Sequence, residues 1–484
     1  MIACGKRIPD NEHGISVSLP TMSDVVGYEQ KSPAVMRSIC SGYPRFICHW
    51  MVQQVQAHLG ERVIALRDQP AVTQLQQRLK IPLEVIPGLP FGAVRLPEAI
   101  TEAQANDLRS FLQHTGLQLP SREAEDYLLQ NALLKQGQPE PVAASAQPGQ
   151  VITNYLADLY TTDPKHLFLF PSGMSAFYAV FDAVERVQRP QGKGLWLQVG
   201  WLYLDTSAIL QKYAAETKVF GIDALDILEA YLHENHTTVA AVTTEVMTNP
   251  LLQTTDIVRL SQLCRRYDIP FIVDTSMPTP VNVDVFPHAD VVIESLTKFA
   301  GGHGDVMGGA AIFHDHGHWP SEIQAHMIQS MPYERDLQVL AYHIRDYRER
   351  VHASNQSAET LLAYFEDHPR VRHVFGAQQS GSRAAYDAVR KQDGGGYGGV
   401  ISVVFDRPLA QIYDQLALLK GPSFGTVFTL CMPYVYLAHY DLVATPAGRA
   451  QLRGYGVDPE LLRISVGLEP VKDIMDAFDA VLQS

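Results

Sequence analysis

"PFIVD" (residues 270–274) and "DVVIESLTKFAGGHGD" (residues 290–305) each begin with a short apolar run and end in polar residues. An apolar run of about four to eight residues bounded by turn-forming residues is typical of a strand buried on both faces. The second run leads to Lys298, although lysine is among the residues least often buried. Lys298 is therefore either a solvated residue at the start of a loop or a chemical group held in a cleft.

The same pattern recurs from residue 167 onward, where apolar runs alternate with helical patterns such as the one in residues 172–187. Further apolar runs are "HLFLF" (166–170), "GLWLQV" (194–199), "TKVFGI" (217–222), "TVAAVTTE" (238–245) and "MGGAAIF" (307–313). Such alternation is typical of βαβ units. We therefore predict an α/β fold with a mostly parallel sheet covered by helices on both faces, which binds ligands at the carboxyl ends of its strands.

The chain of 484 residues is long enough for two or three domains. We expect an N-terminal arm with an extra segment over residues 1–165, the α/β domain over 166–350 and a smaller α+β domain over 351–484. Residues 321–365 are charge-rich and predict a long connecting helix. We find no internal repeat.

Composition narrows the class of function. The net charge of −14 argues against a general nucleic-acid surface, which requires clustered Lys and Arg. The five cysteines form no CxxC pair, and no stretch of eighteen apolar residues is present. We expect a cytoplasmic protein that acts on small molecules, with no membrane or nucleic-acid partner.

Asp274 and Lys298 follow neighbouring predicted strands, so an acid and an amine would face one cleft. Taken singly, Asp274 would be a turn residue and Lys298 a solvated one. Together they have a known use: a lysine forms a Schiff base with pyridoxal phosphate while an acid keeps the pyridine nitrogen protonated. "PSGMSAF" (171–177) adds a candidate phosphate cradle, because the amides of Gly173 and Met174 would lie at a helix start. Ser295 and Thr297 are candidate hydroxyl donors to the same phosphate.

Five pieces of the sequence carry a resemblance to a known family. "PSGMSAF", "TNPLL", "FIVDT", "ADVVIESLTKFAGGHGDVMGG" and "LLRISVGLEP" occur in that order within residues 165–484. Together they resemble the cystathionine γ-synthase family of pyridoxal-phosphate enzymes of cysteine and methionine metabolism. The resemblance implies a fold-type I pyridoxal-phosphate transferase, with pyridoxal 5'-phosphate bound by the α/β domain.

The resemblance also implies residue roles on the cofactor side. Lys298 matches the Schiff-base lysine, and Asp274 matches the partner of the pyridine nitrogen. Gly173 and Met174 match the phosphate-binding turn, with Ser295 and Thr297 beside it. Asn249 matches the asparagine of the family's SNP motif near the cofactor's phenolic oxygen, with Glu245 as a supporting neighbour.

On the substrate side, Arg463 matches the arginine that holds the substrate α-carboxylate, a task suited to a planar fork of donors. Ser423 in "GPSFGT" (421–426) matches a serine of the same pocket, and Asn249 is expected to touch substrate as well. Tyr203 in "GWLYLDT" (200–206) is the expected catalytic aromatic that stacks on the cofactor, with Trp201 as the alternative.

The N-terminal part resembles the longer fungal-type cystathionine γ-synthases, through "ISVSLPTMSDVVGYEQ" (15–30) and "GYPRF" (42–46). This resemblance implies that Tyr43 and Arg45 reach the cofactor phosphate of a neighbouring subunit. The expected assembly is a homodimer or a dimer of dimers with shared active sites.

The expected reaction is γ-replacement on an activated homoserine ester, O-acetyl- or O-succinylhomoserine, with cysteine or another nucleophile. Lys298 would move the α and β protons while Arg463 holds the carboxylate. A carbon nucleophile that gives a non-proteinogenic amino acid, and a γ- or β-lyase reaction on a sulfur amino acid, remain alternatives. Departures from the family, such as "VDTSMP" (273–278) and the long segment 50–165, flank the substrate pocket and leave the substrate open.

Three rival interpretations come from other classes. "FHDHGHWPSEIQAH" (313–326) offers His314, His316, His318 and His326 as a histidine-loop metal site, without an HExxH motif or paired cysteines. A dinucleotide oxidoreductase would share the sheet class, but no GxGxxG follows the early strands. An inactive binding protein would not need to keep both Lys298 and Asp274.

Overall fold

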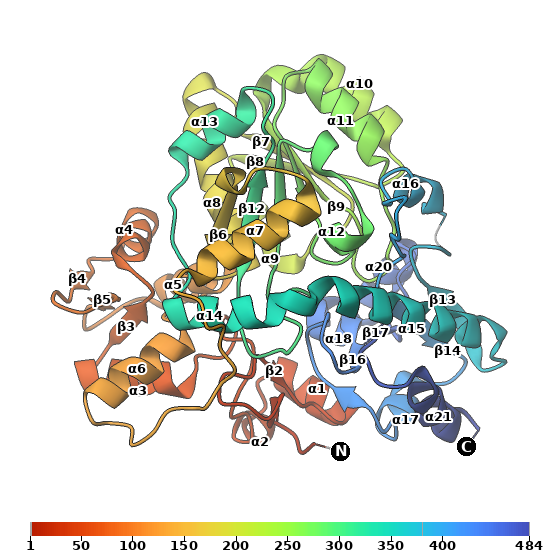
Figure 1. The fold of residues 1–484 in the computed structure, drawn as a ribbon, viewed down its shortest axis with the longest axis horizontal. Coiled ribbons are helices and arrows are strands. Elements are labelled where there is room, and N and C mark those ends of the chain that lie inside the picture. The colour runs from red at the N-terminus through yellow and green to blue at the C-terminus, as the bar shows by residue number, and fades with distance from the viewer. Residues whose placement is uncertain (1, 380, 484) are drawn as a thin grey trace.

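The computed structural model describes residues 2–379 and 381–483, and a seven-stranded sheet lies at its centre (Figure 1). The strand order is β6-β12-β11-β10-β9-β7-β8, in which β12 alone runs antiparallel to its neighbours. The strands are β6 (Leu167–Phe170), β7 (Leu195–Val199), β8 (Glu216–Phe220), β9 (Val239–Glu245), β10 (Phe271–Asp274), β11 (Val291–Glu294) and β12 (Gly309–Phe313). The predicted mostly parallel α/β sheet is confirmed.

Both faces of this sheet are buried, because alternate residues of one strand enter different cores. Leu195 and Leu197 pack against α7, α10 and α11, whereas Trp196 between them packs against α8 and α9. The helices concerned are α7 (Pro148–Tyr160), α8 (Gly173–Gln188), α9 (Leu204–Tyr213), α10 (Leu225–Asn235) and α11 (Ile257–Arg266). Burial on both faces explains why the strands read as continuous apolar runs.

The C-terminal unit is a five-stranded sheet in the order β13-β14-β17-β16-β15, packed against α15 and α21. Its elements are β13 (Val371–Phe375), β14 (Val400–Phe405), β15 (Leu419–Lys420), β16 (Leu430–Pro433), β17 (Leu462–Ser465), α15 (Tyr347–Asp367) and α21 (Val471–Leu482). It is the small α+β unit that the sequence predicts. The expected boundary at residues 350 and 351 falls inside α15, whose apolar face belongs to this unit.

The single long helix expected over residues 321–365 is wrong, because the structure divides it. Three helices occupy this stretch: α13 (Trp319–His326), α14 (Glu334–His343) and α15, with a short 3-10 turn before the last. Pro332 lies in the break before α14, where its ring and missing N–H disfavour a continuous helix. No helix among the described residues has the length and apolarity needed to cross a membrane.

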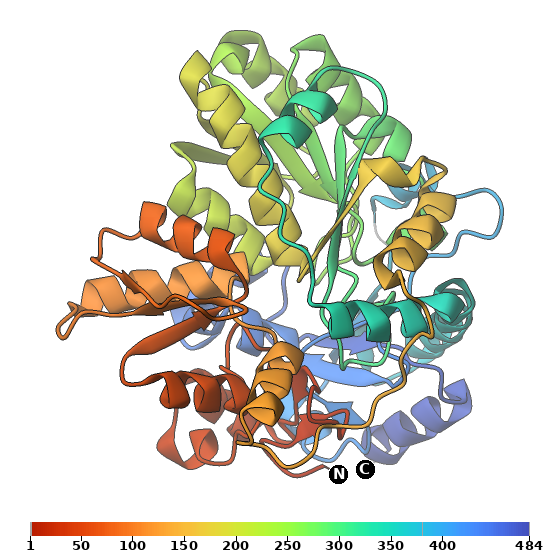
Figure 2. The same cartoon turned by 60° about the vertical axis from the view of Figure 1, so that its left-hand side comes forward.

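Residues 50–130 form a separate N-terminal unit with a three-stranded sheet in the order β3-β5-β4. Its elements are α3 (Trp50–Leu59), β3 (Val63–Leu66), α4 (Gln69–Arg78), β4 (Glu84–Val85), β5 (Gly92–Arg95), α5 (Glu102–Thr115) and α6 (Ser121–Gln130). Leu75 and Phe111 of this unit share an apolar core with Phe177 and Val180 of α8. Figures 1 and 2 show the unit, coloured red to orange, beside the larger units of its own chain. The segment packs against the α/β domain of its own chain, and its expected reach to a neighbouring subunit stays a prediction.

Candidate active site

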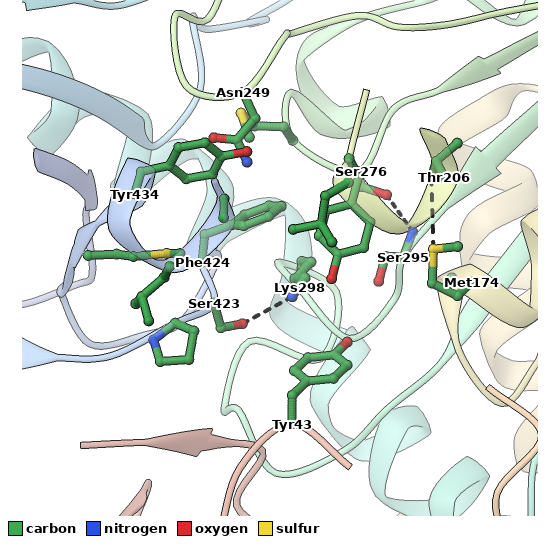
Figure 3. Close-up of a pocket in the computed structure, with 18 of the residues that line it drawn as sticks. Tyr43, Met174, Thr206, Asn249, Ser276, Ser295, Lys298, Ser423, Phe424 and Tyr434 are labelled. Atoms are coloured by element: carbon green, nitrogen blue, oxygen red, sulfur yellow. Dashed lines mark hydrogen bonds between the residues drawn. The ribbon is translucent and has the colours of Figure 1, made fainter. Parts of the chain in front are cut away.

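A cavity of about 400 Å³ opens beyond the carboxyl ends of β9, β10 and β11, where the seven-stranded sheet meets the C-terminal unit. Figure 3 shows side chains from distant segments gathered around Lys298. Predicted site residues that line it are Tyr43, Arg45, Gly173, Met174, Tyr203, Glu245, Asn249, Asp274, Ser295, Lys298, Ser423 and Arg463. Folding thus brings most of the predicted residues into one place.

Lys298 follows β11 and its amine lies inside the cavity. Lys298 Nζ donates a hydrogen bond to Ser423 Oγ at 3.1 Å and lies 4.9 Å from the centre of the Tyr43 ring. Burial lowers the pKa of Lys298, and the positive charges of Arg463 and Arg45 lower it further. No carboxylate among the described residues forms an ion pair with this amine. A lysine in this setting is more readily neutral than one in water, so its unprotonated amine is more often available to act as a nucleophile or to accept a proton.

The loop that carries Ser423 is held close to Lys298. Ser423 has φ +104°, a region that non-glycine residues rarely adopt and that costs roughly 1–3 kcal/mol. Gly425 follows at φ +75°, and a Cβ there would come within 2.7 Å of the Phe299 nitrogen and 3.0 Å of the Lys298 carbonyl carbon. Glycine is required at this position because the backbone of the lysine loop approaches it so closely.

Asp274 and Glu245 end neighbouring parallel strands, and their residues pair directly in the sheet. Asp274 Oδ1 accepts from the backbone N–H of Ser276 at 2.7 Å, and Glu245 Oε1 accepts from the backbone N–H of Tyr203. Burial raises the pKa of Asp274 to about 6. Burial, and then the charge of Asp274, raise the pKa of Glu245 well above its usual range. Carboxyl groups at these two strand ends favour the protonated form of a basic group that is bound in the cavity next to them.

The start of α8 forms an anion cradle. Ser172 Oγ accepts from the backbone N–H of Ser175 at 3.1 Å and so caps the helix. The amides of Gly173 and Met174 in the first turn have no intrahelical acceptor, and the positive end of the helix dipole lies there. A Cβ on Gly173 would come within 2.7 Å of Ser295 Cβ, so the approach of Ser295 requires glycine.

Ser295 lines this cradle, whereas Thr297 lies behind the cavity wall. Thr297 Oγ1 donates to the carbonyl of Gly308 at 3.2 Å and accepts from the N–H of the same residue at 3.1 Å. The hydroxyl thus contacts the Gly308 backbone, and it also lies within hydrogen-bond reach of Tyr43; its expected contact with the phosphate stays a prediction. The bond closes the loop that follows Lys298.

The structure distinguishes Tyr203 from Trp201. Tyr203 lines the cavity, and its hydroxyl accepts from Arg45 Nη2 at 2.9 Å. Trp201 instead packs edge-on against His439 and Tyr455 outside the cavity. Tyr203 is therefore the aromatic ring available to stack on a planar ligand.

Arg463 projects from β17 into the other end of the cavity. Its Nη2 donates to the Ser423 carbonyl at 2.7 Å, and its Nη1 donates to Asn249 Oδ1 at 3.4 Å. Burial lowers the pKa of Arg463 to about 10, and no described carboxylate pairs with it. Its Nε is buried without a hydrogen-bond partner among the described residues. A buried guanidinium with free donors suits a carboxylate ligand.

Tyr43 and Arg45 line the cavity within the single chain described, and their expected reach to a neighbouring subunit stays a prediction. Burial opposes ionisation of Tyr43, yet Lys298 and Arg45 outweigh it and lower the pKa of this phenol. Arg45 Nη1 donates to Asp205 Oδ2 at 2.5 Å, within the same chain. The dimer with shared active sites that the resemblance implies likewise stays a prediction.

Several cavity residues were not predicted. Ser276 Oγ accepts from the backbone N–H of Ser295 at 2.7 Å, and Phe424 and Tyr434 flank Arg463. Ser276 lies two residues after Asp274, so its place after a strand was a usable signal. Phe424 and Tyr434 gave no such signal in the sequence, because aromatic residues of a C-terminal unit ordinarily belong to its hydrophobic core.

The histidine-loop metal site is not supported. His314 and His316 lie on a loop after β12, where the side chain of His316 is 82% exposed, and His326 Nδ1 contacts the Glu322 carbonyl. Among residues 2–379 and 381–483, no group of three or more His, Cys, Asp or Glu is arranged to hold a metal ion.

The cavity fits pyridoxal 5'-phosphate. Its helix start and Ser295 suit the phosphate, Asp274 suits the pyridine nitrogen, and Lys298 is a free amine for the aldehyde. Arg45 Nε, like Arg463 Nε, is buried without a hydrogen-bond partner among the described residues. Two buried guanidinium groups at the cavity, of which only Arg45 is paired with a described carboxylate, suit one phosphate and one substrate carboxylate.

Comparison with known proteins agrees with this geometry. A family model described as "Cys/Met metabolism PLP-dependent enzyme" matches residues 148–483. The L-2-amino-4-chloropent-4-enoate dechlorinase/desaturase of Streptantibioticus cattleyicolor is 35% identical over 98% of this chain and 97% of its own length. Cystathionine gamma-synthase of Neurospora crassa is also 35% identical, over 68% of this chain and 53% of that protein.

The fold has solved counterparts. Cystathionine gamma synthase from Xanthomonas oryzae pv. oryzae superimposes with a TM-score of 0.58 at 21% identity, covering 68% of this chain and 83% of that one. Cystathionine gamma-lyase from Lactobacillus plantarum gives 0.56 at 22% identity, covering 68% of this chain and 84% of that one. Since the family model matches residues 148–483 and full-length relatives extend the likeness, the chain belongs to the Cys/Met metabolism family of pyridoxal-phosphate-dependent enzymes, of the γ-synthase and γ-lyase type.

Proposed function

We propose that this enzyme acts on L-α-amino acids that carry a leaving group on the γ carbon. The principal reaction is γ-replacement on an activated homoserine ester, O-acetyl- or O-succinylhomoserine, with cysteine or another nucleophile. The observation that carries the proposal is the arrangement of Lys298 and Arg463, both of which contact Ser423. One amine and one unpaired guanidinium thereby face the same part of the cavity.

The carboxylate end of the substrate is bound by Arg463. Its guanidinium is held by the Ser423 carbonyl and by Asn249 Oδ1, so its orientation is fixed before substrate arrives. Because no described carboxylate pairs with this buried guanidinium, a substrate carboxylate gains charge-assisted hydrogen bonds from it. This contact fixes which bond of the α carbon faces Lys298.

Lys298 moves the protons. The bound cofactor supplies an electron sink that is conjugated with the substrate α carbon. Lys298 Nζ would take the α proton, give that proton up to the conjugated system, and then, neutral again, take a β proton one carbon further along, as its lowered pKa allows. Ser423 Oγ and the Tyr43 ring hold the amine in position between these carbons.

The leaving group faces an apolar part of the cavity. Phe424, Met432, Tyr434 and Leu437 line the wall beyond Arg463. Lys31 also lines the cavity and offers a cation for the second carboxylate of a succinyl ester, so the lining suits an acetyl or a succinyl ester.

A second candidate is loss of halide from a γ-haloalkenyl amino acid. It is favoured by one observation: a relative aligned over 98% of this chain has a name that describes dechlorination of L-2-amino-4-chloropent-4-enoate. That compound bears its chlorine on the γ carbon, so both candidates use the same proton transfers by Lys298. They differ in whether a nucleophile replaces the leaving group.

The test is to incubate the holoenzyme with O-acetyl-L-homoserine, O-succinyl-L-homoserine and L-2-amino-4-chloropent-4-enoate, each with and without cysteine. Products are identified by mass. Cystathionine from O-acetyl-L-homoserine and cysteine supports the principal proposal, and chloride release without cysteine supports the second. No release of acetate, succinate or chloride from any of the three contradicts both.

A further inference from the structure

An acid and an amine line the cavity on a segment that takes no part in the proton transfers. Glu29 is the last residue of α1 (Met22–Glu29), and Lys31 follows it by two residues. Both line the cavity together with Tyr28, and Lys31 Nζ lies 4.4 Å from the centre of the Tyr28 ring. Neither charged group forms a hydrogen bond or an ion pair with a described residue. Both charges are therefore available to a ligand.

The backbone of Lys31 is in a conformation that a lysine rarely adopts. Lys31 has φ +55°. Its N–H donates to the Tyr28 carbonyl at 3.2 Å, and the N–H of Ser32 donates to the Gly27 carbonyl at 2.8 Å. These two bonds form a Schellman motif, in which the left-handed position is usually glycine. Residues held in this region without being glycine cluster at functional sites, so the lysine indicates that its side chain has a use.

An apolar wall separates this pair from Arg463. Helix α1 packs against α18 (Tyr434–Ala438) of the C-terminal unit, as Figure 1 shows. The ring of Tyr434 at the start of α18 lies 5.2 Å from Arg463 Cζ, and Leu437, about one turn later, lines the cavity. Lys31 is exposed, whereas Arg463 is buried. The cavity therefore has a charged inner end, an apolar middle and a charged outer end.

Together, the two outer charges suit a zwitterion better than a simple anion. Burial raises the pKa of Glu29 to about 7, while the charge of Lys31 lowers it and that of Asp441 raises it. A half-buried carboxyl group without a paired cation gains from a cationic ligand, which favours its ionised form. The ammonium of Lys31 attracts a carboxylate. A ligand with only a carboxylate would meet repulsion from the two acids, whereas an α-amino acid offers each group its opposite charge.

We propose that Glu29 and Lys31 bind the ammonium and carboxylate of a second amino acid, so that the nucleophile of the γ-replacement is itself an α-amino acid with a thiol. This inference rests on the proposed function. Overall, the sulfur forms a bond to the γ carbon, the carboxylate leaving group departs with the C–O bonding electrons, and the thiol proton is released to solvent. The product has two zwitterionic ends and an apolar middle, as the cavity does. The family model begins at residue 148, so neither residue belongs to the region that it matches.

The first test measures binding without turnover. Borohydride fixes the cofactor to Lys298, so that no aldehyde remains to react with an amino group. Calorimetry then compares L-cystathionine with L-ethionine, which has the same chain without the distal ammonium and carboxylate. We expect the wild type to bind L-cystathionine at least about tenfold more tightly than L-ethionine. Equal dissociation constants for the two ligands, or no detectable binding of either, overturn the proposal.

Lys31→Gly removes the amine and also the unfavourable backbone conformation, so a folding defect does not imitate its effect. The matched control is Arg62→Gly, because Arg62 is an exposed cation with φ +59° that does not line the cavity. We expect Lys31→Gly to lose the preference for L-cystathionine over L-ethionine and Arg62→Gly to keep it. A preference that survives in Lys31→Gly overturns the role of Lys31.

Glu29 is tested with S-(2-carboxyethyl)-L-homocysteine, which lacks only the distal ammonium of L-cystathionine. We expect Glu29→Gln to bind L-cystathionine about tenfold more weakly than the wild type does, and to bind S-(2-carboxyethyl)-L-homocysteine within about twofold of the wild type. The same weakening for both ligands overturns the role of Glu29.

Turnover distinguishes the nucleophile from a succinyl leaving group as the ligand of Lys31. With O-acetyl-L-homoserine as co-substrate, we expect Lys31→Gly to raise KM for cysteine about tenfold and to leave KM for the ester unchanged. A higher KM for O-succinyl-L-homoserine with an unchanged KM for cysteine assigns Lys31 to the leaving group and overturns the proposal. If the wild type prefers L-cystathionine in the binding test but forms none from any ester and cysteine, the proposed γ-replacement is wrong and the amino-acid subsite stands.

Discussion

Lys298 and Ser423 join the two large sheets at the site. The amine follows β11 of the seven-stranded sheet, and the hydroxyl that accepts its 3.1 Å hydrogen bond lies between β15 and β16 of the five-stranded sheet. The catalytic amine thus depends on the C-terminal unit for its position. Ser423 keeps an unfavourable φ of +104° at this point of contact.

Two substitutions of Ser423 separate its hydroxyl from its backbone. Both Ser423→Ala and Ser423→Gly remove the acceptor of Lys298, so we expect kcat/KM to fall about tenfold in each. Only glycine tolerates the positive φ, so Ser423→Gly should unfold in urea with a free energy about 1 kcal/mol above that of Ser423→Ala. Equal stabilities of the two variants would show that this backbone is not strained.

Arg463 should affect substrate binding and leave cofactor binding unchanged. Arg463→Lys keeps a positive charge but loses the planar fork, so we expect KM for a γ-substituted amino acid to rise about tenfold, and Arg463→Met to raise it about a hundredfold. The dissociation constant of pyridoxal phosphate, measured in parallel, should not change. A weaker cofactor complex with an unaltered KM would reassign Arg463 to the cofactor.

Asp274 should make the cofactor-free protein less stable as the pH rises. Burial raises the pKa of Asp274 to about 6, so the folded state favours the protonated carboxyl group. The stability that the protonated group contributes is complete below the unfolded pKa of about 3.9. It is lost as the pH rises through about 6. We therefore expect cofactor-free Asp274→Asn to exceed the wild type in unfolding free energy by about 2 kcal/mol at pH 8 and to match it near pH 4. Urea unfolding measures both.

The control for that experiment is Asp393→Asn, since Asp393 is exposed and lies outside the cavity. It should give no difference that depends on pH. An Asp274→Asn difference that is the same at pH 4 and pH 8 would rule out a raised pKa as its cause.

Gly116 and Gly192 form a matched pair for the contact between α5 and the phosphate cradle. Both have a positive φ, +66° and +79°, but a Cβ on Gly192 meets nothing within 4 Å. Alanine at either position should cost about 1 kcal/mol of stability through the backbone. Only Gly116→Ala should also weaken cofactor binding, because its methyl group displaces the Ser172 cap. A cofactor dissociation constant raised equally in both variants, measured by dialysis, would contradict the role of this contact.

The strands and the strand-end residues were predictable from the sequence. Strands that are buried on both faces have unbroken apolar sequences. In a parallel sheet, the residues that follow the strands lie at the same edge. The sequence alone therefore predicts that Asp274 and Lys298 lie close together. Tyr203 and Trp201 lie two residues apart, so the sequence left open which one enters the cavity. Packing of Trp201 against His439 and Tyr455 decides it.

The support around Arg45 was not predictable. Asp205 is separated from His114 by 91 residues and from Arg45 by 160, and the three meet only because the N-terminal unit packs onto α8 and α9. No local pattern marks such a contact. The homodimer or dimer of dimers, and the cytoplasmic location, remain predictions, the first of which light scattering of the purified protein would measure.

The proposed mechanism depends on Lys298 as the group that moves the protons, so that a γ leaving group can depart. Its most direct test is NMR of the product formed in D₂O from whichever γ-substituted amino acid the enzyme converts, with the wild type and with cofactor-loaded Lys298→Ala. We expect the wild type to release the leaving group and to place deuterium on the α or β carbon of the product, and Lys298→Ala to do neither. Release at the wild-type rate by Lys298→Ala, or a wild-type product without deuterium at either carbon, would contradict this mechanism.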